Sequence, residues 1–191
     1  MSPARGARLA QAWVSLKAED PEAVSALAVA RRTLEAGRGL ASVRRFRLFE
    51  LRGELPERER LENLLHRSTW FYNPHKERCV VRMEAAEAAP LEPGEQAVLV
   101  AERDAGRRAA PERWWLHVTG LEVEVREATA WALRFETGVD AAAAAADLAV
   151  LRDAAHGLLC NPHAQEHRLA GADVPLPWLA PARARAPGRR P

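Results

Sequence analysis

The hydrophobic and polar positions of the first half of the chain predict alternating strands and helices. Residues 11–17 alternate loosely between apolar and polar side chains, which is typical of a strand. Residues 20–22 (Asp-Pro-Glu) then supply a capping side chain, a proline at the first helical position and an acid in the first turn. Apolar residues at helical spacing extend this helix to Gly37. Residues 42–51 have a β-rich composition, either as one bent strand or as two strands joined by a tight turn.

A second helix and a closing strand complete this first series. From Pro56 the apolar positions fall three or four residues apart, which predicts an amphipathic helix. It is expected to end at Asn73-Pro74, because proline disfavours helical geometry in the residue before it. Residues 79–83 predict a strand, and residues 84–95 have the composition of a linker.

The same order of elements recurs in the second half of the chain, and a match between landmarks of the two halves indicates a duplication. Asn73-Pro74-His75 matches Asn161-Pro162-His163, and Phe49-Glu50 matches Phe135-Glu136 at nearly the same spacing. The expected elements of the second copy are a strand at 97–101, a helix at 111–119, extended segments at 121–125 and 130–136, a long helix at 139–159 and a weak strand at 166–170.

This order predicts an α+β protein made of two ferredoxin-like (β-α-β-β-α-β) half-domains with antiparallel sheets, joined as an internal pseudo-dimer. The expected boundaries are 8–84 for the first repeat, 85–95 for the linker, 96–171 for the second repeat and 172–191 for a tail rich in proline and arginine. From residue 180 the tail has no apolar side chains to bury, so it is expected to be disordered or to lie on the surface.

Composition narrows the class of protein. The 28 basic and 26 acidic residues leave a net charge of +2, so the chain has no strong field to recruit nucleic acid or an anionic membrane. No apolar run has the length of a membrane span, and the first residues lack the apolar core of a signal peptide. Two cysteines are too few for a disulfide framework, and we expect a reducing cytoplasm. The six tryptophans are best explained by packing within and between the repeats.

Motifs of catalysis are missing from the sequence. It contains no glycine-flanked serine elbow, no P-loop and no Gly-x-Gly-x-x-Gly turn, so we expect neither a catalytic residue nor a cofactor of this chain's own. Cys160, His163 and His167 have spacings that zinc sites use, and His75 and Cys79 of the first repeat could add a ligand. Ordinary surface histidines and half-buried cysteines are the favoured interpretation. The Asn-Pro pairs themselves are explained structurally as helix ends, with asparagine in the left-handed cap conformation.

The residues around the second Asn-Pro pair resemble the closing segment of a known family. Leu158 to Glu166 (Leu-Leu-Cys-Asn-Pro-His-Ala-Gln-Glu), preceded by a helix, resembles the end of PurS, the small subunit of phosphoribosylformylglycinamidine (FGAM) synthase. Trp70 to Glu77 is a second, degenerate copy of it. Val43-Arg44 leading to Phe49-Glu50 is similar to the central region of the family, and Val125-Arg126 leading to Phe135-Glu136 repeats it.

The resemblance implies a non-catalytic assembly subunit of purine biosynthesis. Its partners would be a PurL-like synthase subunit, which alone would hold ATP and Mg, and a PurQ-like glutaminase subunit, with no nucleic acid and no membrane. The residues that it nominates for contacts with a partner or ligand are Arg44, Glu50, Asn73, Glu77, Arg126, Glu136, Asn161 and Glu166. A ferredoxin-like small-molecule sensor or regulatory binding module is the alternative, and a metal protein centred on Cys160, His163 and His167 is a weaker one.

Overall fold

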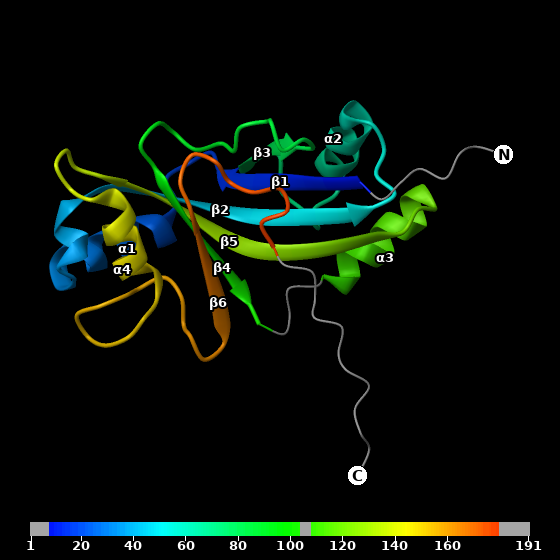
Figure 1. The fold of residues 1–191 in the computed structure, drawn as a ribbon. Coiled ribbons are helices and arrows are strands. Elements are labelled where there is room, and N and C mark those ends of the chain that lie inside the picture. The colour runs from blue at the N-terminus through cyan, green and yellow to red at the C-terminus, as the bar shows by residue number, and fades with distance from the viewer. Residues whose placement is uncertain (1–7, 104–107, 180–191) are drawn as a thin grey trace, which may run out of the picture.

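Strands from both halves of the sequence join in one antiparallel sheet, with the strand order β3-β1-β2-β5-β4-β6 (Figure 1). The structure is a computed structural model that describes residues 8–103 and 108–179. Its α+β elements are β1 (Arg8–Leu16), α1 (Pro21–Thr33), the 3-10 helix η1 (Ala36–Gly39), β2 (Leu40–Gly53), α2 (Arg58–His66), β3 (Glu77–Arg82), β4 (Gln96–Glu102), α3 (Ala109–Thr119), β5 (Val123–Phe135), α4 (Ala141–Ala149) and β6 (Gln165–Ala170).

The sheet has the symmetry of a duplication. Each repeat runs strand-helix-strand-helix-strand, and its first strand lies between its third and second strands. The two repeats meet where β2 pairs antiparallel with β5, from Leu40 opposite Phe135 to Gly53 opposite Val123. A quasi-two-fold axis therefore passes through the centre of this pair. Both halves of the chain therefore belong to one continuous sheet.

The middle of each repeat is one long strand instead of the two strands of a β-α-β-β-α-β unit. β2 resolves the open choice at 42–51 as a single strand, and β5 runs unbroken through residues 126–129, where two separate segments were expected. The sequence Arg-Glu-Ala-Thr at 126–129 contains no glycine, proline or asparagine that would favour a tight turn. Both strands continue because the partner strand of the other repeat pairs with their whole length.

All four helices of the described residues contribute to cores on one face of the sheet, and each core combines helices from different repeats. Around Trp115 of α3 and Leu61 of α2, one apolar cluster covers β1 and the C-terminal half of β2. Around Ala30 of α1 and Leu148 of α4, another covers β4 and the C-terminal end of β5. Figure 1 shows these two helix pairs at opposite ends of the long strands. Each repeat thus needs a helix of the other to bury its sheet.

The opposite face is covered by connecting segments instead of helices. The linker contributes Ala89 and Leu91, and the segment after β6 contributes Val174, Trp178 and Leu179 to an apolar cluster on this face. Residues 172–179, predicted as part of the tail, are therefore packed against the sheet through three buried side chains. We call residues 172–179 the strap. The remainder of the predicted tail, residues 180–191, lies outside the described residues.

Helix lengths differ from those that the apolar pattern predicts. The long helix expected at 139–159 ends at Ala149, because the following loop folds back and satisfies the last carbonyl groups: Leu158 N donates to Leu148 O at 2.9 Å and Cys160 N to Ala149 O at 2.8 Å. Gly157 permits this turn with φ +80. Similarly α2 ends at His66, before the predicted end at residue 72. No helix in the described part of the chain has the length and apolar character needed to cross a membrane.

Candidate functional site

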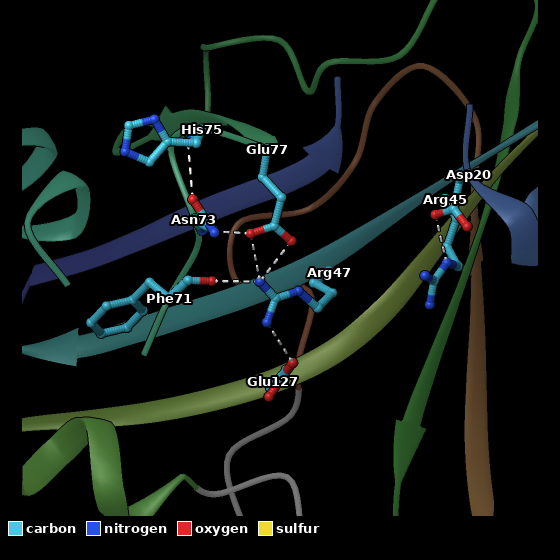
Figure 2. Close-up of polar contacts among 8 residues, drawn as sticks. All are labelled: Asp20, Arg45, Arg47, Phe71, Asn73, His75, Glu77 and Glu127. Atoms are coloured by element: carbon cyan, nitrogen blue, oxygen red, sulfur yellow. Dashed lines mark hydrogen bonds and ion pairs between the residues drawn. The ribbon is translucent and has the colours of Figure 1, made fainter. Parts of the chain in front are cut away.

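The first Asn-Pro motif forms a tight turn between α2 and β3 (Figure 2). The side-chain oxygen of Asn73 accepts a hydrogen bond from His75 N at 3.0 Å, and its carbonyl accepts from Glu77 N at 2.8 Å. Asn73 N in turn donates to the Glu77 carboxylate at 2.6 Å. The asparagine side chain therefore closes an Asx turn, and Glu77 at the start of β3 locks it from the other side.

Arg47 of β2 connects this turn to the centre of the sheet. Its guanidinium donates to Phe71 O at 2.8 Å and to Glu77 at 3.1 Å, and it lies 3.8 Å from Glu127 of β5 (Figure 2). Arg108 also pairs with Glu127, at 2.9 Å. These side chains form a half-buried charged cluster on the helix-bearing face. The cluster joins the turn of one repeat to the central strand of the other.

The second Asn-Pro motif repeats this turn with different side chains. Asn161 Oδ1 accepts from His163 N at 3.0 Å, and Asn161 N donates to Gln165 Oε1 at 2.9 Å. Gln165 stands where the first repeat has Glu77, and its amide group donates to Glu102 at 2.8 Å instead of pairing with an arginine. The backbone of the turn is preserved, while its charges have changed.

These turns correct the expectation that the asparagines are left-handed helix caps. Every residue with positive φ in the described part of the chain is a glycine, so neither asparagine has the left-handed conformation. Each Asn-Pro pair lies just before a strand, several residues after the nearest helix has ended. The motif is an entry to the closing strand of each repeat.

The register of the sheet shows which residues of the two repeats are equivalent. The two turns make Arg78 equivalent to Glu166. Arg78 pairs in the sheet with Ser15 of β1, and Glu166 pairs with Ala101 of β4, so Ser15 and Ala101 are equivalent. Two residues earlier on these strands, Trp13 is equivalent to Leu99, and their neighbours across the sheet, Leu48 and Ala130, are equivalent in turn. On β2 and β5 this register matches Val43-Arg44 with Val125-Arg126, as in the sequence comparison. It makes Phe49-Glu50 equivalent to Trp131-Ala132. The expected equivalence of Phe49-Glu50 with Phe135-Glu136 is therefore wrong.

A second group of polar side chains is buried on the opposite face of the first repeat. Arg82, Gln11 and Glu50 lie side by side on β3, β1 and β2, each less than 4% exposed. Gln11 donates to Glu50 at 2.8 Å and accepts from Arg82 at 2.9 Å and from the Trp13 indole at 3.3 Å. We call Arg82, Gln11 and Glu50 the polar row. Burial lowers the pKa of Arg82, with the nearby carboxylates of Glu87 and Glu50 opposing this effect.

The polar row binds the main chain of the strap. Glu50 Oε1 accepts from the backbone N–H groups of Trp178, at 2.6 Å, and Leu179, at 3.1 Å. Gln11 donates to Pro175 O at 3.0 Å, and Arg82 donates to Val174 O at 3.1 Å. The Trp178 ring stacks on Trp13 with ring centroids 6.0 Å apart. Side chains from three neighbouring strands therefore hold the main chain of the strap against the sheet.

The second repeat has no such row. The residues equivalent to Gln11, Glu50 and Arg82 are Ala97, Ala132 and Ala170, and these alanines also lie side by side on neighbouring strands. Ala97 and Ala132 are buried in the apolar cluster that the linker helps to cover. The buried polar row is thus a property of the first repeat alone. Its role is specific to the segment that it binds.

The other residues nominated from the sequence are distributed over the molecule. Arg44 makes two hydrogen bonds to buried Glu95 of the linker, one of them at 2.8 Å, and this carboxylate raises the arginine pKa. Its equivalent, Arg126, pairs with Glu124 at 2.7 Å. Glu136 and Glu166 are exposed, at the end of β5 and on β6. The eight nominated residues therefore form no single site: Glu50 belongs to the polar row, and Asn73 and Asn161 belong to the two turns with their neighbours.

The weaker metal alternative has no support in the geometry. Among the described residues no group of three His, Cys, Asp or Glu side chains is placed to hold a metal ion. Cys160 is buried, whereas His163 and His167 are exposed. Burial raises the pKa of the Cys160 thiol and raises that of Cys79 to about 12. Both thiols are therefore in their unreactive, protonated form at neutral pH.

Gln11, Trp13 and Arg82 are the residues of this site that sequence reasoning missed. Gln11 and Arg82 are polar residues on strands, a pattern typical of solvent-facing positions, but both are buried and both contact the strap. A comparison of the chain with protein-family models, curated proteins and solved structures gives no match. The interpretation of function therefore depends on the geometry of the molecule and on the sequence resemblance.

Proposed function

We propose that this chain is a non-catalytic, PurS-like assembly subunit of FGAM synthase that bridges a glutaminase subunit and an ATP-dependent synthase subunit in purine biosynthesis. The observation that carries the proposal is the pairing of β2 with β5, which joins two copies of one unit across a quasi-two-fold axis. A covalent pair of equivalent units presents two related surfaces in a fixed arrangement. Such an arrangement suits a bridge between two partners.

The two halves have acquired different surface charges at equivalent positions, which favours two different partners. Arg78 on the edge strand β3 is equivalent to Glu166 on the edge strand β6, and both side chains are exposed. Glu77 at the first turn is equivalent to Gln165 at the second. Two identical subunits could not place opposite charges at these equivalent positions. Two repeats in one chain can carry opposite charges at these positions. Each half would then attract the partner whose surface charge complements its own.

We further infer that each half is a ferredoxin-like unit completed by the other repeat. In the first half, residues 123–129 of β5 lie beside β2, so that four strands are adjacent in the order β3-β1-β2-β5. The helices over these strands are α2 of the same repeat and α3 of the other. The second half has the corresponding arrangement with α1 and α4. An exchange of one helix and one strand between repeats accounts for the long central strands.

Affinity purification of the native complex tests the proposed function. A tagged chain expressed from its own locus is expected to co-purify with the synthase and glutaminase subunits. Deletion of the gene is expected to abolish FGAM formation with glutamine as the nitrogen donor and to require added purines for growth. Unchanged growth of the deletion strain without added purines would contradict the proposal.

Charge reversal at the two equivalent edge positions gives a sharper test. Arg78→Glu is expected to weaken the binding of one partner subunit, and Glu166→Arg that of the other, because each exposed side chain lies on a different half. Glu59→Arg, on the exposed side of α2, is the control and is expected to change neither. Equal loss of both partners from each variant would contradict the assignment of one partner to each half.

A further inference from the structure

We propose that the polar row and Trp13 form a binding site for peptides of the pattern Val-x-x-x-Trp-Leu, which the chain's own strap occupies as a replaceable ligand. This site is independent of the assembly role proposed above. It lies on the face of the first repeat opposite the helices. Its ligand is recognised by backbone hydrogen bonds and by three apolar side chains.

The hydrogen bonds of the site are directed at the peptide backbone. Side chains from β1, β2, β3 and β6 contact two N–H groups and three carbonyl groups of the strap, the last being Trp178 O, which accepts from Arg168 at 2.7 Å. Within the described residues the strap adds no strand to the sheet. It is therefore held as a peptide ligand is held, by side chains of the receptor.

The apolar contacts define the pattern of the peptide. Val174, Trp178 and Leu179 are each no more than 4% exposed, whereas Asp173, Pro175 and Pro177 are exposed. The exposed positions tolerate proline because the site uses no N–H group from them. The stacking of Trp178 on Trp13 adds selectivity for an aromatic residue at that position.

The comparison between repeats indicates that the polar row exists to bind this segment. A buried row of arginine, glutamine and glutamate is costly unless each group has partners, and three alanines serve at the equivalent positions of the second repeat. Apart from Arg82 Nε, which has no hydrogen-bond partner among the described residues, the polar groups of the row are satisfied largely through the strap, through each other and through Ala85 O. A segment held at its end by side chains alone is also the kind of segment that opens locally without global unfolding.

Peptide binding to a full-length variant tests the proposal. The double variant Trp178→Ala, Leu179→Ala removes two apolar anchors of the strap and leaves the polar row intact. A fluorescent peptide with the sequence of residues 172–179 is expected to bind this variant, as measured by fluorescence anisotropy. The wild-type chain is expected to bind the peptide roughly 100-fold more weakly, because a tethered strap competes at an effective concentration in the millimolar range.

Two control experiments test which contacts recognise the peptide. A peptide with alanine in place of its tryptophan is expected to lose binding. Addition of Glu50→Gln to the double variant is expected to weaken binding by about tenfold, because it replaces the charged acceptor of two N–H groups with a neutral one. Absence of peptide binding to the double variant, with its cooperative unfolding retained, would overturn the proposal.

Hydrogen exchange of the wild-type chain decides the question if the double variant does not fold. The N–H groups of Trp178 and Leu179 are expected to exchange through a local opening whose rate is independent of low denaturant concentrations. The N–H groups of the β2–β5 pair are expected to exchange only through global unfolding. If the strap and the β2–β5 pair exchange with the same free energy and the same denaturant dependence, the strap is a fixed part of the core and the proposal fails.

Discussion

The side-chain amide of Gln11 donates a 2.8 Å hydrogen bond to the carboxylate of Glu50, whereas the equivalent residues of the second repeat are Ala97 and Ala132. Gln11 is completely buried and contacts Arg82, Trp13 and the strap as well. It is the central member of the polar row. Glu50, Arg82 and Trp13 each make a hydrogen bond to its side-chain amide.

Gln11→Ala is therefore expected to lower the free energy of unfolding by about 2–4 kcal/mol, since it leaves several buried polar groups short of a partner. Urea denaturation followed by circular dichroism measures the effect. Gln96→Ala, at the half-buried start of β4, is the control and is expected to cost less than about 1 kcal/mol. Equal effects of the two substitutions would show that the polar row does not stabilise the fold.

The two turns differ in charge, and exchange of their side chains tests what each charge contributes. Glu77→Gln gives the first turn the residue of the second, keeps an acceptor for Asn73 N and loses the ion pair with Arg47. We expect it to cost about 1 kcal/mol or less. Glu77→Ala also removes the acceptor and is expected to cost about 1–2 kcal/mol more.

The reciprocal change Gln165→Glu brings a carboxylate next to Glu102, to which the Gln165 amide now donates. This substitution is expected to destabilise the protein at neutral pH and to become nearly neutral in high salt, because salt screens the repulsion of exposed charges. Thermal unfolding at low and high salt measures both effects. Salt-independent destabilisation by Gln165→Glu would contradict the electrostatic explanation.

The sequence was sufficient to predict most helices and strands and the match between the two Asn-Pro motifs. The first helix begins as expected because Asp20 accepts hydrogen bonds from Glu22 N and Ala23 N, and the equivalence of Asn73 and Asn161 is seen in two turns with the same backbone contacts. Such features are encoded locally, within a few residues. The local pattern also indicated an α+β protein, which the sheet and helices confirm.

The partners of the long strands could not be predicted in the same way. Alternation along β2 shows which side chains share a face, but the strand that lies beside them depends on contacts between residues far apart in the sequence. The burial of Glu50 has the same origin, because it depends on Trp178 and Leu179, at the other end of the chain. The polar row could therefore not be predicted without knowing that the strap packs against the sheet.

Two buried tryptophans differ in the partners of their indole N–H groups. Trp13 donates to Gln11 Oε1 at 3.3 Å, while the indole of Trp115 finds no acceptor among the described residues. Trp13→Phe removes a bond from the polar row and loses ring area against Trp178, and is expected to cost about 2–3 kcal/mol. Trp115→Phe loses similar ring area but also removes an unpaired buried donor, so it is expected to cost about 1 kcal/mol less. Chemical denaturation measures the free energy of unfolding of both variants. A greater decrease for Trp115→Phe than for Trp13→Phe would contradict the assignment of hydrogen-bond partners to the two indoles.

The thiol of Cys79, on the edge strand β3, makes the free energy of unfolding depend on pH in the alkaline range. Burial raises its pKa to about 12, and the carboxylates of Glu62 and Glu77 act in the same direction. Because the unfolded chain loses this proton at about pH 8.5, the stabilisation is complete below that pH and is lost as the pH rises toward 12. We expect Cys79→Ala to remove this part of the decline in the free energy of unfolding between pH 8 and pH 10.5.

Alkylation provides an independent measurement of the same thiol. In the variant Cys160→Ala, where Cys79 is the remaining cysteine, iodoacetamide at pH 8 is expected to react on the order of a thousandfold more slowly with the native protein than with the protein in urea, because only the thiolate is nucleophilic. The ratio should be nearly constant well below the unfolded pKa of about 8.5, where the thiol is mostly protonated in both states. Rapid alkylation of the native variant would show that the thiol is accessible and ionised, and that its burial does not control the alkaline decline.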